Sequence, residues 1–250
     1  MLEIKSLTAG YPGNVVLKDI SLSFPQGTVT VVAGPNGCGK STLLKAVAGI
    51  LPSAGQIRLD GEALGDLSSR NRAQRIAFLP QSRQVPEINV KRLVLHGRFP
   101  YLHYPRQYGK ADHAAAETAM AAMKITDLAD RSLASLSGGQ RQKAYIAMAL
   151  AQDTKVVLLD EPTTFLDIAH QLQLMTLAGE LAARGKTVVL VLHDLTLAME
   201  HADRLVILDR GQVRACGSPE AVFASGCLKE VFGVDLGRTE VNGGWKYFYL

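Results

Sequence analysis

The segment GPNGCGKST, Gly34 to Thr42, constrains the fold of this chain more than any other. It matches the pattern G-x-x-x-x-G-K-[ST], and it lies between an apolar run at 28–33 and a stretch with helical spacing at 41–50. In this context the main-chain N–H groups of the loop and the helix N-terminus together bind phosphate. The segment therefore predicts an α/β fold in which a buried strand leads through a nucleotide site into a helix.

We expect the whole loop to contact nucleotide phosphates: Gly34, Pro35, Asn36, Gly37, Cys38, Gly39, Lys40, Ser41 and Thr42. Lys40 is expected to reach the β- and γ-phosphates, and the Ser41 hydroxyl is expected to ligate Mg²⁺. A tight turn that binds nothing would need the glycines but not Lys40. Because Cys38 lies close to a helix N-terminus, we also expect a lowered thiol pKa and inactivation by thiol reagents, with ATP protecting.

A second apolar run, VVLLD at 156–160, ends in two adjacent carboxylates, Asp160 and Glu161. Successive side chains of a strand point in opposite directions, so one carboxylate can hold the Mg²⁺ shell while the other faces an attacking water. An acidic pair can also simply cap the turn that begins at Pro162. Because the phosphate loop is present in the same chain, we interpret the pair as part of a hydrolysis site.

Three further side chains are expected at the same site. Gln81 ends the strand expected at 75–80, where it can contact Mg²⁺ or water. His193 ends the strand expected at 187–193, where a neutral imidazole can contact the γ-phosphate. Tyr11, in the loop of an N-terminal hairpin, can stack on adenine. Each residue alone has an ordinary structural explanation, and their convergence on one edge of the sheet favours the functional one.

The stretch LSGGQRQ, Leu136 to Gln142, opens a helix expected over 138–152. Ser137 is a good N-cap, and Gly138 and Gly139 leave main-chain N–H groups unobstructed, which makes a second anion site. One chain has no obvious way to point two helix N-termini at a single γ-phosphate, whereas two chains packed head to tail do. A glycine hinge would explain the glycines but not the whole string. The stretch therefore predicts a site completed by a second copy of the chain.

Continuous apolar runs predict a parallel sheet covered on both faces. The remaining segments predict crossover helices at 41–50 and 170–185, and an antiparallel sheet from the alternating pattern of the first thirty residues. We expect a single domain over 1–250. The expected strands are 28–33, 75–80, 156–160, 187–193 and 204–208. The domain is expected to contain a nucleotide-binding core at 1–81 and 153–216, a helical subdomain at 82–152, and C-terminal helices followed by a tail at 217–250. Within the helical subdomain, helices are expected at 111–124 and 138–152.

Composition and charge narrow the class of protein. Hydrophobic residues make up 47% and charged residues 20% of the chain, as in ordinary soluble globular proteins. A net charge of +4 is too weak and too scattered to indicate nucleic acid binding. Cys38, Cys216 and Cys227 form neither a metal-ligand spacing nor a disulfide framework, which predicts a reducing compartment. No signal peptide or membrane span is expected.

These motifs together resemble the ATP-binding cassette subunit of an ABC transporter, over nearly the whole chain. The matching positions are the Walker A loop at 34–42, the Q-loop at Gln81, the signature at 136–140, Walker B at 156–161, the D-loop around Leu166 and Asp167, the switch His193 and the A-loop Tyr11. The resemblance implies that two subunits sandwich two ATP. Each ATP would meet one chain's Walker A and the other chain's signature residues Ser137, Gly138, Gly139 and Gln140.

The resemblance also implies roles for individual residues. Glu161 would polarise the attacking water, and His193 would sense the γ-phosphate. Ser41, Gln81 and Asp160 would hold Mg²⁺. Asp167 has two interpretations: it organises the subunit interface, or it caps the helix that follows.

A narrower resemblance concerns the transported substrate. The segments 97–112, 162–171, 192–213 and 230–234 resemble importers of iron chelates, haem and vitamin B12, and the run Arg98 to Leu102 is most similar to iron(III)-siderophore systems. The alternatives are the same role for haem, vitamin B12 or another metal chelate, an exporter cassette, or a soluble ABC ATPase without a permease.

This resemblance further implies partners and a location. Two integral membrane permease subunits would dock near Gln81 and residues 97–108, on the cytoplasmic face of the membrane. An extracytoplasmic substrate-binding protein would act indirectly. Two other interpretations of this loop are that it only packs against the helical subdomain, or that its aromatic and arginine side chains stack on nucleic acid.

Overall fold

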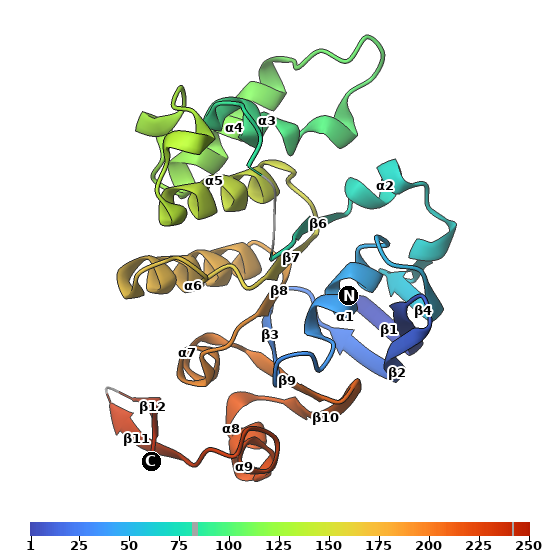
Figure 1. Cartoon of the computed structure of the whole chain (residues 1–250), viewed down its shortest axis with the longest axis vertical. Coiled ribbons are helices and arrows are strands. Elements are labelled where there is room, and N and C mark those ends of the chain that lie inside the picture. The colour runs from blue at the N-terminus through green and yellow to red at the C-terminus, as the bar shows by residue number, and fades with distance from the viewer. Residues whose placement is uncertain (82–84, 242) are drawn as a thin grey trace.

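The computed structural model describes residues 1–81, 85–241 and 243–250, and its centre is a six-stranded sheet (Figure 1). The strand order is β10-β9-β3-β8-β7-β6, and every neighbouring pair except β9 and β10 is parallel. This arrangement confirms the expected α/β fold. The strands are β3 (Val29–Ala33), β6 (Ile76–Leu79), β7 (Val156–Asp160), β8 (Thr187–Val191), β9 (Arg204–Asp209) and β10 (Gln212–Gly217).

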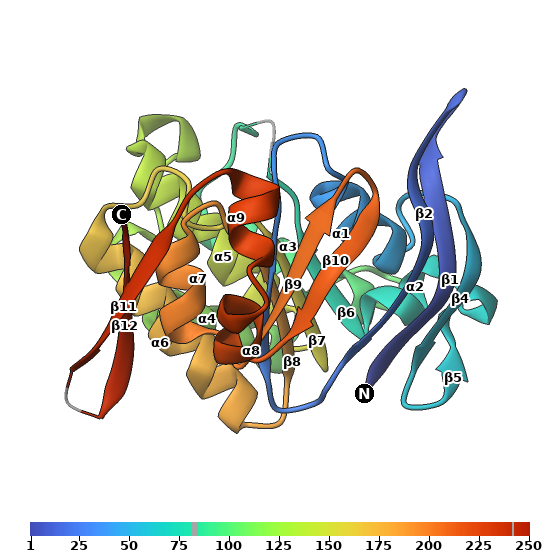
Figure 2. The same ribbon diagram turned by 90° about the horizontal axis from the view of Figure 1, so that it is seen from below.

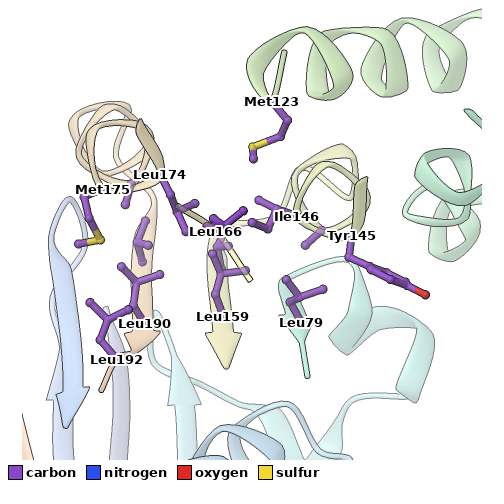
Figure 3. Packing of buried hydrophobic residues seen from close by; sticks show 14 of the residues in the cluster. Leu79, Met123, Tyr145, Ile146, Leu159, Leu166, Leu174, Met175, Leu190 and Leu192 are labelled. Atoms are coloured by element: carbon purple, nitrogen blue, oxygen red, sulfur yellow. The ribbon is translucent and has the colours of Figure 1, made fainter. Parts of the chain in front are cut away.

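The central strands are apolar at most positions because each face of the sheet meets a different hydrophobic core. In β7, Val157 and Leu159 belong to the core under helices α5 (Gly138–Ala151) and α6 (Ile168–Ala183). Figure 3 shows Leu79, Leu159 and Leu190 pointing from three adjacent strands towards those helices. Val156 and Leu158 belong instead to the core on the opposite face. Strand alternation between two apolar layers therefore explains the continuous runs.

The opposite face is covered by helix α1 (Lys40–Val47) and a four-stranded antiparallel sheet in the order β2-β1-β4-β5. Its strands are β1 (Leu2–Tyr11), β2 (Asn14–Phe24), β4 (Ser53–Leu59) and β5 (Glu62–Ala63). The expected N-terminal antiparallel sheet is confirmed. Tyr11, expected in the hairpin loop, is the last residue of β1 and pairs with Asn14.

A group of helices lies between β6 and β7 along the chain, at one end of the molecule (Figure 1). Residues 82–84, where we expected it to begin, lie outside the described residues. Within the described ranges, no helix is long and apolar enough to cross a membrane. The elements of this region and of the segment before β6 are η1 (Leu64–Asp66), α2 (Ser69–Ala73), α3 (Val90–His96), η2 (Phe99–Tyr101), α4 (Lys110–Ala122), η3 (Thr126–Leu128), η4 (Leu133–Ser135) and α5.

The end of the chain differs from expectation. After α7 (Leu195–His201), β9 and β10 come the expected helix pair, α8 (Pro219–Ala224) and α9 (Cys227–Phe232). The residues that follow form an antiparallel hairpin of β11 (Leu236–Val241) and β12 (Gly244–Tyr249), where we had expected only a tail. The left-handed backbone of Gly243 (φ 78°) allows the tight turn between the two strands.

Two strands are shorter than expected, which moves two predicted site residues off the sheet. β6 pairs with β7 as far as Leu79, and β8 pairs with β7 as far as Val191. Gln81 and His193 therefore lie in the connections beyond the strand ends rather than on the strands. The carboxyl ends of β3, β6, β7 and β8 all lie at one edge because these strands are parallel.

Candidate functional site

The phosphate loop connects β3 to α1, and its shape requires glycine at two positions. Gly39 is the N-cap of α1 with φ 114°, which side chains other than hydrogen rarely allow. A Cβ on Gly34 would lie 2.1 Å from the carbonyl oxygen of Leu208, so the loop packs directly on β9. The Lys40 ammonium is buried and donates to the carbonyl oxygens of Gly34 (2.7 Å) and Pro35 (2.9 Å). A fixed positive charge thus lies within the loop.

Asp160, the last residue of β7, is almost completely buried. Neither of its carboxylate oxygens has a hydrogen-bond partner of good geometry among the described residues. Burial raises the pKa of this carboxyl; the neighbouring Ser41 hydroxyl opposes the shift, and the charge of Glu161 adds to it. Two buried oxygens with unused lone pairs, beside a hydroxyl, are the hard donors that Mg²⁺ prefers. Asp160 and Ser41 therefore fit the predicted magnesium site.

The Glu161 carboxylate, just after β7, contacts side chains that follow the ends of β6 and β8. Its Oε2 accepts a hydrogen bond from Nε2 of Gln81 at 2.5 Å, and its Oε1 lies 2.6 Å from Nε2 of His193. Its side chain is 10% exposed, whereas that of His193 is 47% exposed. The structure therefore brings together Gln81, Glu161 and His193, which are far apart in the sequence.

The backbone of Glu161 explains how its side chain diverges from that of Asp160. Its φ is 51°, in the left-handed region that residues other than glycine adopt at a cost of about 1–3 kcal/mol. This conformation ends the strand and turns the chain towards Pro162. Strained residues of this kind cluster at functional sites, where the surrounding structure holds them.

The LSGGQRQ stretch forms the N-terminus of α5, as predicted. Oγ of Ser137 accepts from the N–H of Gln140 at 3.2 Å, and Oε1 of Gln140 accepts from the N–H of Ser137 at 3.1 Å. This reciprocal pair is a capping box, which fixes the start of the helix. A surface hollow beside it is lined by Ser137, Gly139, Gln140, Lys143, Phe165, Leu166, Asp167 and His170, and by no described residue of the phosphate loop.

Asp167 caps the following helix, which was one of its two interpretations. Its carboxylate accepts from the N–H of His170 at 2.9 Å and lies 2.7 Å from Nδ1 of the same residue. The main-chain hydrogen bond from His170, followed by its ring, lowers the pKa of Asp167. A role at a subunit interface stays a prediction.

Tyr11 lies beside the last turn of α1. Its ring is 44% exposed, and its hydroxyl oxygen accepts a hydrogen bond from Nζ of Lys45 at 3.3 Å. The Lys45 ammonium is 5.8 Å from the ring centroid. A flat aromatic surface is thus available next to the helix that begins with the phosphate loop, while stacking on adenine stays a prediction.

Two residues near the site were not found by sequence reasoning. Phe165 has φ 68°, is 76% exposed and lies against the backbone of Gly138 and Gly139. In the sequence, the aromatic side chain within the loop PTTFLD was the feature that could have identified this residue. Gln142 is buried and donates from Nε2 to the carbonyl oxygen of Pro162 at 2.8 Å, so it links α5 to the loop after β7.

The segment 97–108 has an inward and an outward part. The Arg98 guanidinium donates to Asp112 (3.0 Å) and to the Ala151 carbonyl (3.0 Å), and it stacks 4.0 Å from the ring centroid of Tyr101. These contacts pack the segment against the helices. Tyr104, by contrast, is 97% exposed. The segment therefore both packs on the helical group and presents an aromatic surface.

The expected direction of the Cys38 pKa is wrong, whereas inactivation by thiol reagents with ATP protecting stays a prediction. The thiol is 4% exposed, and burial raises its pKa, although the positive charge of Lys40 and a hydrogen bond from the main chain of Lys40 oppose that shift. The sequence predicted a lowered pKa because Cys38 lies close to a helix N-terminus. Desolvation of the thiolate within the packed loop outweighs the helix dipole.

The family comparison agrees with this geometry. The model of the ABC transporter family matches residues 17–164, from β2 to the loop after β7. The chain belongs to the ABC transporter family.

Individual relatives cover nearly the whole chain. A probable siderophore transport system ATP-binding protein of Bacillus subtilis (strain 168) is 42% identical over 96% of this chain and 88% of its own length. An achromobactin transport ATP-binding protein of Dickeya dadantii (strain 3937) is 44% identical over 92% of this chain and 87% of its own.

Two solved structures show the same fold. The structure of a putative metal-chelate type ABC transporter in an inward-facing conformation has a TM-score of 0.84 and 29% identity, and the match covers 100% of this chain and 96% of that one. The dimeric structure of a bacterial ABC transporter cassette has a TM-score of 0.77 and 27% identity, over 88% of this chain and 99% of that one.

Burial of Cys38 leads to a prediction about its reactivity. At neutral pH, iodoacetamide should alkylate Cys38 much more slowly than the exposed Cys216, because reaction needs a thiolate that the loop disfavours and a path to the sulfur. Raising the pH should increase the rate at Cys38, since its raised pKa delays thiolate formation. Peptide mass spectrometry of timed samples measures both rates, with the unfolded chain as the control. Alkylation of Cys38 as fast as Cys216 in the folded protein would contradict the assignment.

Proposed function

We propose that this chain is the ATP-binding and ATP-hydrolysing subunit of an ABC importer that takes up an iron(III)-siderophore-type chelate through a membrane permease. The observation that carries the hydrolytic part is the convergence of Gln81, Glu161 and His193 beside the phosphate loop. The substrate class is supported by the siderophore and achromobactin transport relatives and by the metal-chelate type structural neighbour.

In this proposal the phosphate loop binds ATP. Lys40 supplies its buried ammonium to the β- and γ-phosphates, and the main-chain N–H groups of residues 34–42 surround the phosphate oxygens. Ser41, Gln81 and Asp160 would hold Mg²⁺, which neutralises charge on the phosphates when it is bound. Support comes from the two buried oxygens of Asp160, which have no hydrogen-bond partner of good geometry among the described residues. Tyr11 provides the aromatic surface for adenine.

Glu161 acts as the general base. A water attacks the γ-phosphorus, and the Glu161 carboxylate accepts the water's proton as the bond to ADP breaks. His193 and Gln81 each contact one carboxylate oxygen and so hold the base in one orientation. The exposed part of the His193 ring leaves it within reach of the γ-phosphate, whose presence it would sense.

The proposed active unit contains two chains. The capping box at Ser137 holds the N-terminus of α5 open to solvent, next to a hollow that the phosphate loop does not line. A second copy, packed head to tail, would bring its Ser137, Gly138, Gly139 and Gln140 against the ATP on the first. The exposed apolar side chains of Phe165 and Ile168 beside this hollow favour burial between the two copies. Asp167 would lie at the same interface.

The permease is the other proposed partner. A hollow next to the signature helix is lined by Gln81, Val85, Gly138, Arg141, Gln142, Tyr145, Thr164 and Phe165. Together with the exposed part of 97–108, it would receive a cytoplasmic helix from each of two integral membrane permease subunits. The chain would then be peripheral to the cytoplasmic face of the membrane, and an extracytoplasmic binding protein would deliver the chelate. Movement of Gln81 would couple docking to hydrolysis.

Replacing Glu161 by Gln should reduce ATP hydrolysis by about 10²–10⁴-fold, because the amide cannot accept the proton. ATP binding should persist, and an ATP-bound dimer should accumulate in sedimentation velocity. Glu180→Gln, an exposed change on α6, is the matched control and should keep the wild-type rate. Unchanged hydrolysis in Glu161→Gln would remove Glu161 from the base role.

The substrate class is tested in cells that lack the gene and receive iron only as a ferric siderophore. Wild type should restore growth and uptake of radioactive iron, whereas Lys40→Ala, which weakens phosphate binding, should not. Growth restored only on haem, or only vitamin B12 uptake, would assign the chain to one of the alternative substrates. No effect on any chelate would contradict the importer role.

Replacing Tyr104 by Ala should weaken co-purification with the permease by about fivefold or more, as truncation of a central interface aromatic does. Val15→Ala, an equally simple change at a 54% exposed residue of β2, is the control. ATP hydrolysis by the isolated chain should be the same in both variants. Full co-purification of Tyr104→Ala would exclude this part of 97–108 from the docking surface.

A further inference from the structure

The position of His193 depends on the helix that follows it. β8 ends at Val191, Leu192 is buried, and Asp194 is already the N-cap of α7. The Asp194 carboxylate accepts from the N–H groups of Thr196 (2.9 Å) and Leu197 (3.1 Å), which fixes the helix start. Because only two residues separate the strand from the cap, any displacement of α7 must move His193 relative to Glu161.

The C-terminal hairpin contacts the last turn of α7. In the last turn, Glu200 accepts from Nζ of Lys246 (2.5 Å) and from the N–H of Tyr247 (3.4 Å). The Glu200 side chain is 19% exposed, so this ion pair is partly shielded from water. β12 packs along α7, and Tyr249 at its end is 52% exposed.

The hairpin is itself anchored on another part of the molecule. Tyr247 is buried against Phe223 of α8, with ring centroids 5.5 Å apart. The Arg238 guanidinium lies 4.9 Å from the ring centroid of Phe223 and 4.0 Å from that of Trp245. Both views of the molecule show β12 running alongside α7, with α8 nearby (Figures 1 and 2). The hairpin thus connects α7 to α8.

We propose that this hairpin positions His193 for hydrolysis: Lys246 and the main chain of Tyr247 hold Glu200 of α7, and α7 keeps Nε2 of His193 at 2.6 Å from Glu161. Glu200 and Lys246 are positioning residues, since neither has a hydrogen bond or ion pair with the described phosphate loop or with Glu161. The inference rests on the proposed hydrolytic role of Glu161 and His193. It assigns a function to the last part of the chain, which the nucleotide motifs do not include.

The test is the double variant Glu200→Gln with Lys246→Met, which removes the ion pair between α7 and the hairpin and leaves the buried Tyr247 in place. Its kcat for ATP should fall by about 5- to 100-fold, since a displacement of about 1 Å in a catalytic group has effects of this order. KM for ATP should change less than about twofold, because the phosphate loop and Tyr11 lie elsewhere. Lys246→Arg, which preserves the ion pair, should keep most of the activity.

Two control variants alter the same region without touching α7. Lys229→Met removes the exposed Lys229–Asp235 pair (2.9 Å), and Phe248→Ala truncates a 44% exposed ring that lies beside Gly237 of β11. Both should retain wild-type kcat. A loss of kcat in the controls equal to that in the double variant would overturn the inference, because it would indicate general destabilisation of the hairpin.

A second measurement does not depend on activity. Hydrogen exchange in residues 192–201 should be faster in the double variant than in wild type, and unchanged in residues 29–47. Wild-type hydrolysis with equal kcat and equal exchange in the double variant would overturn the positioning role while leaving the proposed function intact. Absence of hydrolysis in wild type would instead contradict the proposed function, and faster exchange in 192–201 would still support the contact between the hairpin and α7.

Discussion

The parallel alignment of β6, β7 and β8 is the constraint on which the candidate site depends. Because the three strands run in one direction and in register, their carboxyl ends lie at the same edge of the sheet. Gln81, Glu161 and His193 follow those ends and meet at one carboxylate. A strand running the other way would place its residue at the opposite edge. Parallel strands of this kind are buried on each side, so apolar layers cover both faces of the sheet.

The two adjacent carboxylates have different environments, and this difference separates their chemistry. Asp160 continues the strand, is buried and has no hydrogen-bond partner of good geometry among the described residues, as suits a metal ligand. Glu161 leaves the strand through a left-handed backbone conformation, and both of its oxygens are held by neighbours. The predicted second anion site at the start of α5 lies beside a different hollow. The proposed dimer is the arrangement in which both anion sites serve one nucleotide.

Sequence patterns predicted the elements that carry a strong local signal. The glycine loop, the apolar strands and the helix beginning after Ser137 are where their residues indicated, because each depends on local backbone geometry or on burial of a continuous run. Boundaries were less accurate: β8 ends two residues before His193, where pairing with β7 stops. The direction of the Cys38 pKa was wrong because it depends on how the loop packs against its surroundings. The terminal hairpin was missed, although Trp245 and Tyr247 alternate with other residues as strand residues do.

The sequence by itself determined the class of site, since a glycine loop with Lys40, a carboxylate pair after a buried run and a capped glycine pair each impose local chemistry. Only the tertiary structure decided which side chains meet. Three sets of contacts join residues that are distant in the chain. They are the contacts of Glu161 with Gln81 and His193, the hydrogen bond from Gln142 to Pro162, and the ion pair of Lys246 with Glu200. Such contacts arise from strand order, helix packing and burial, which no local pattern encodes.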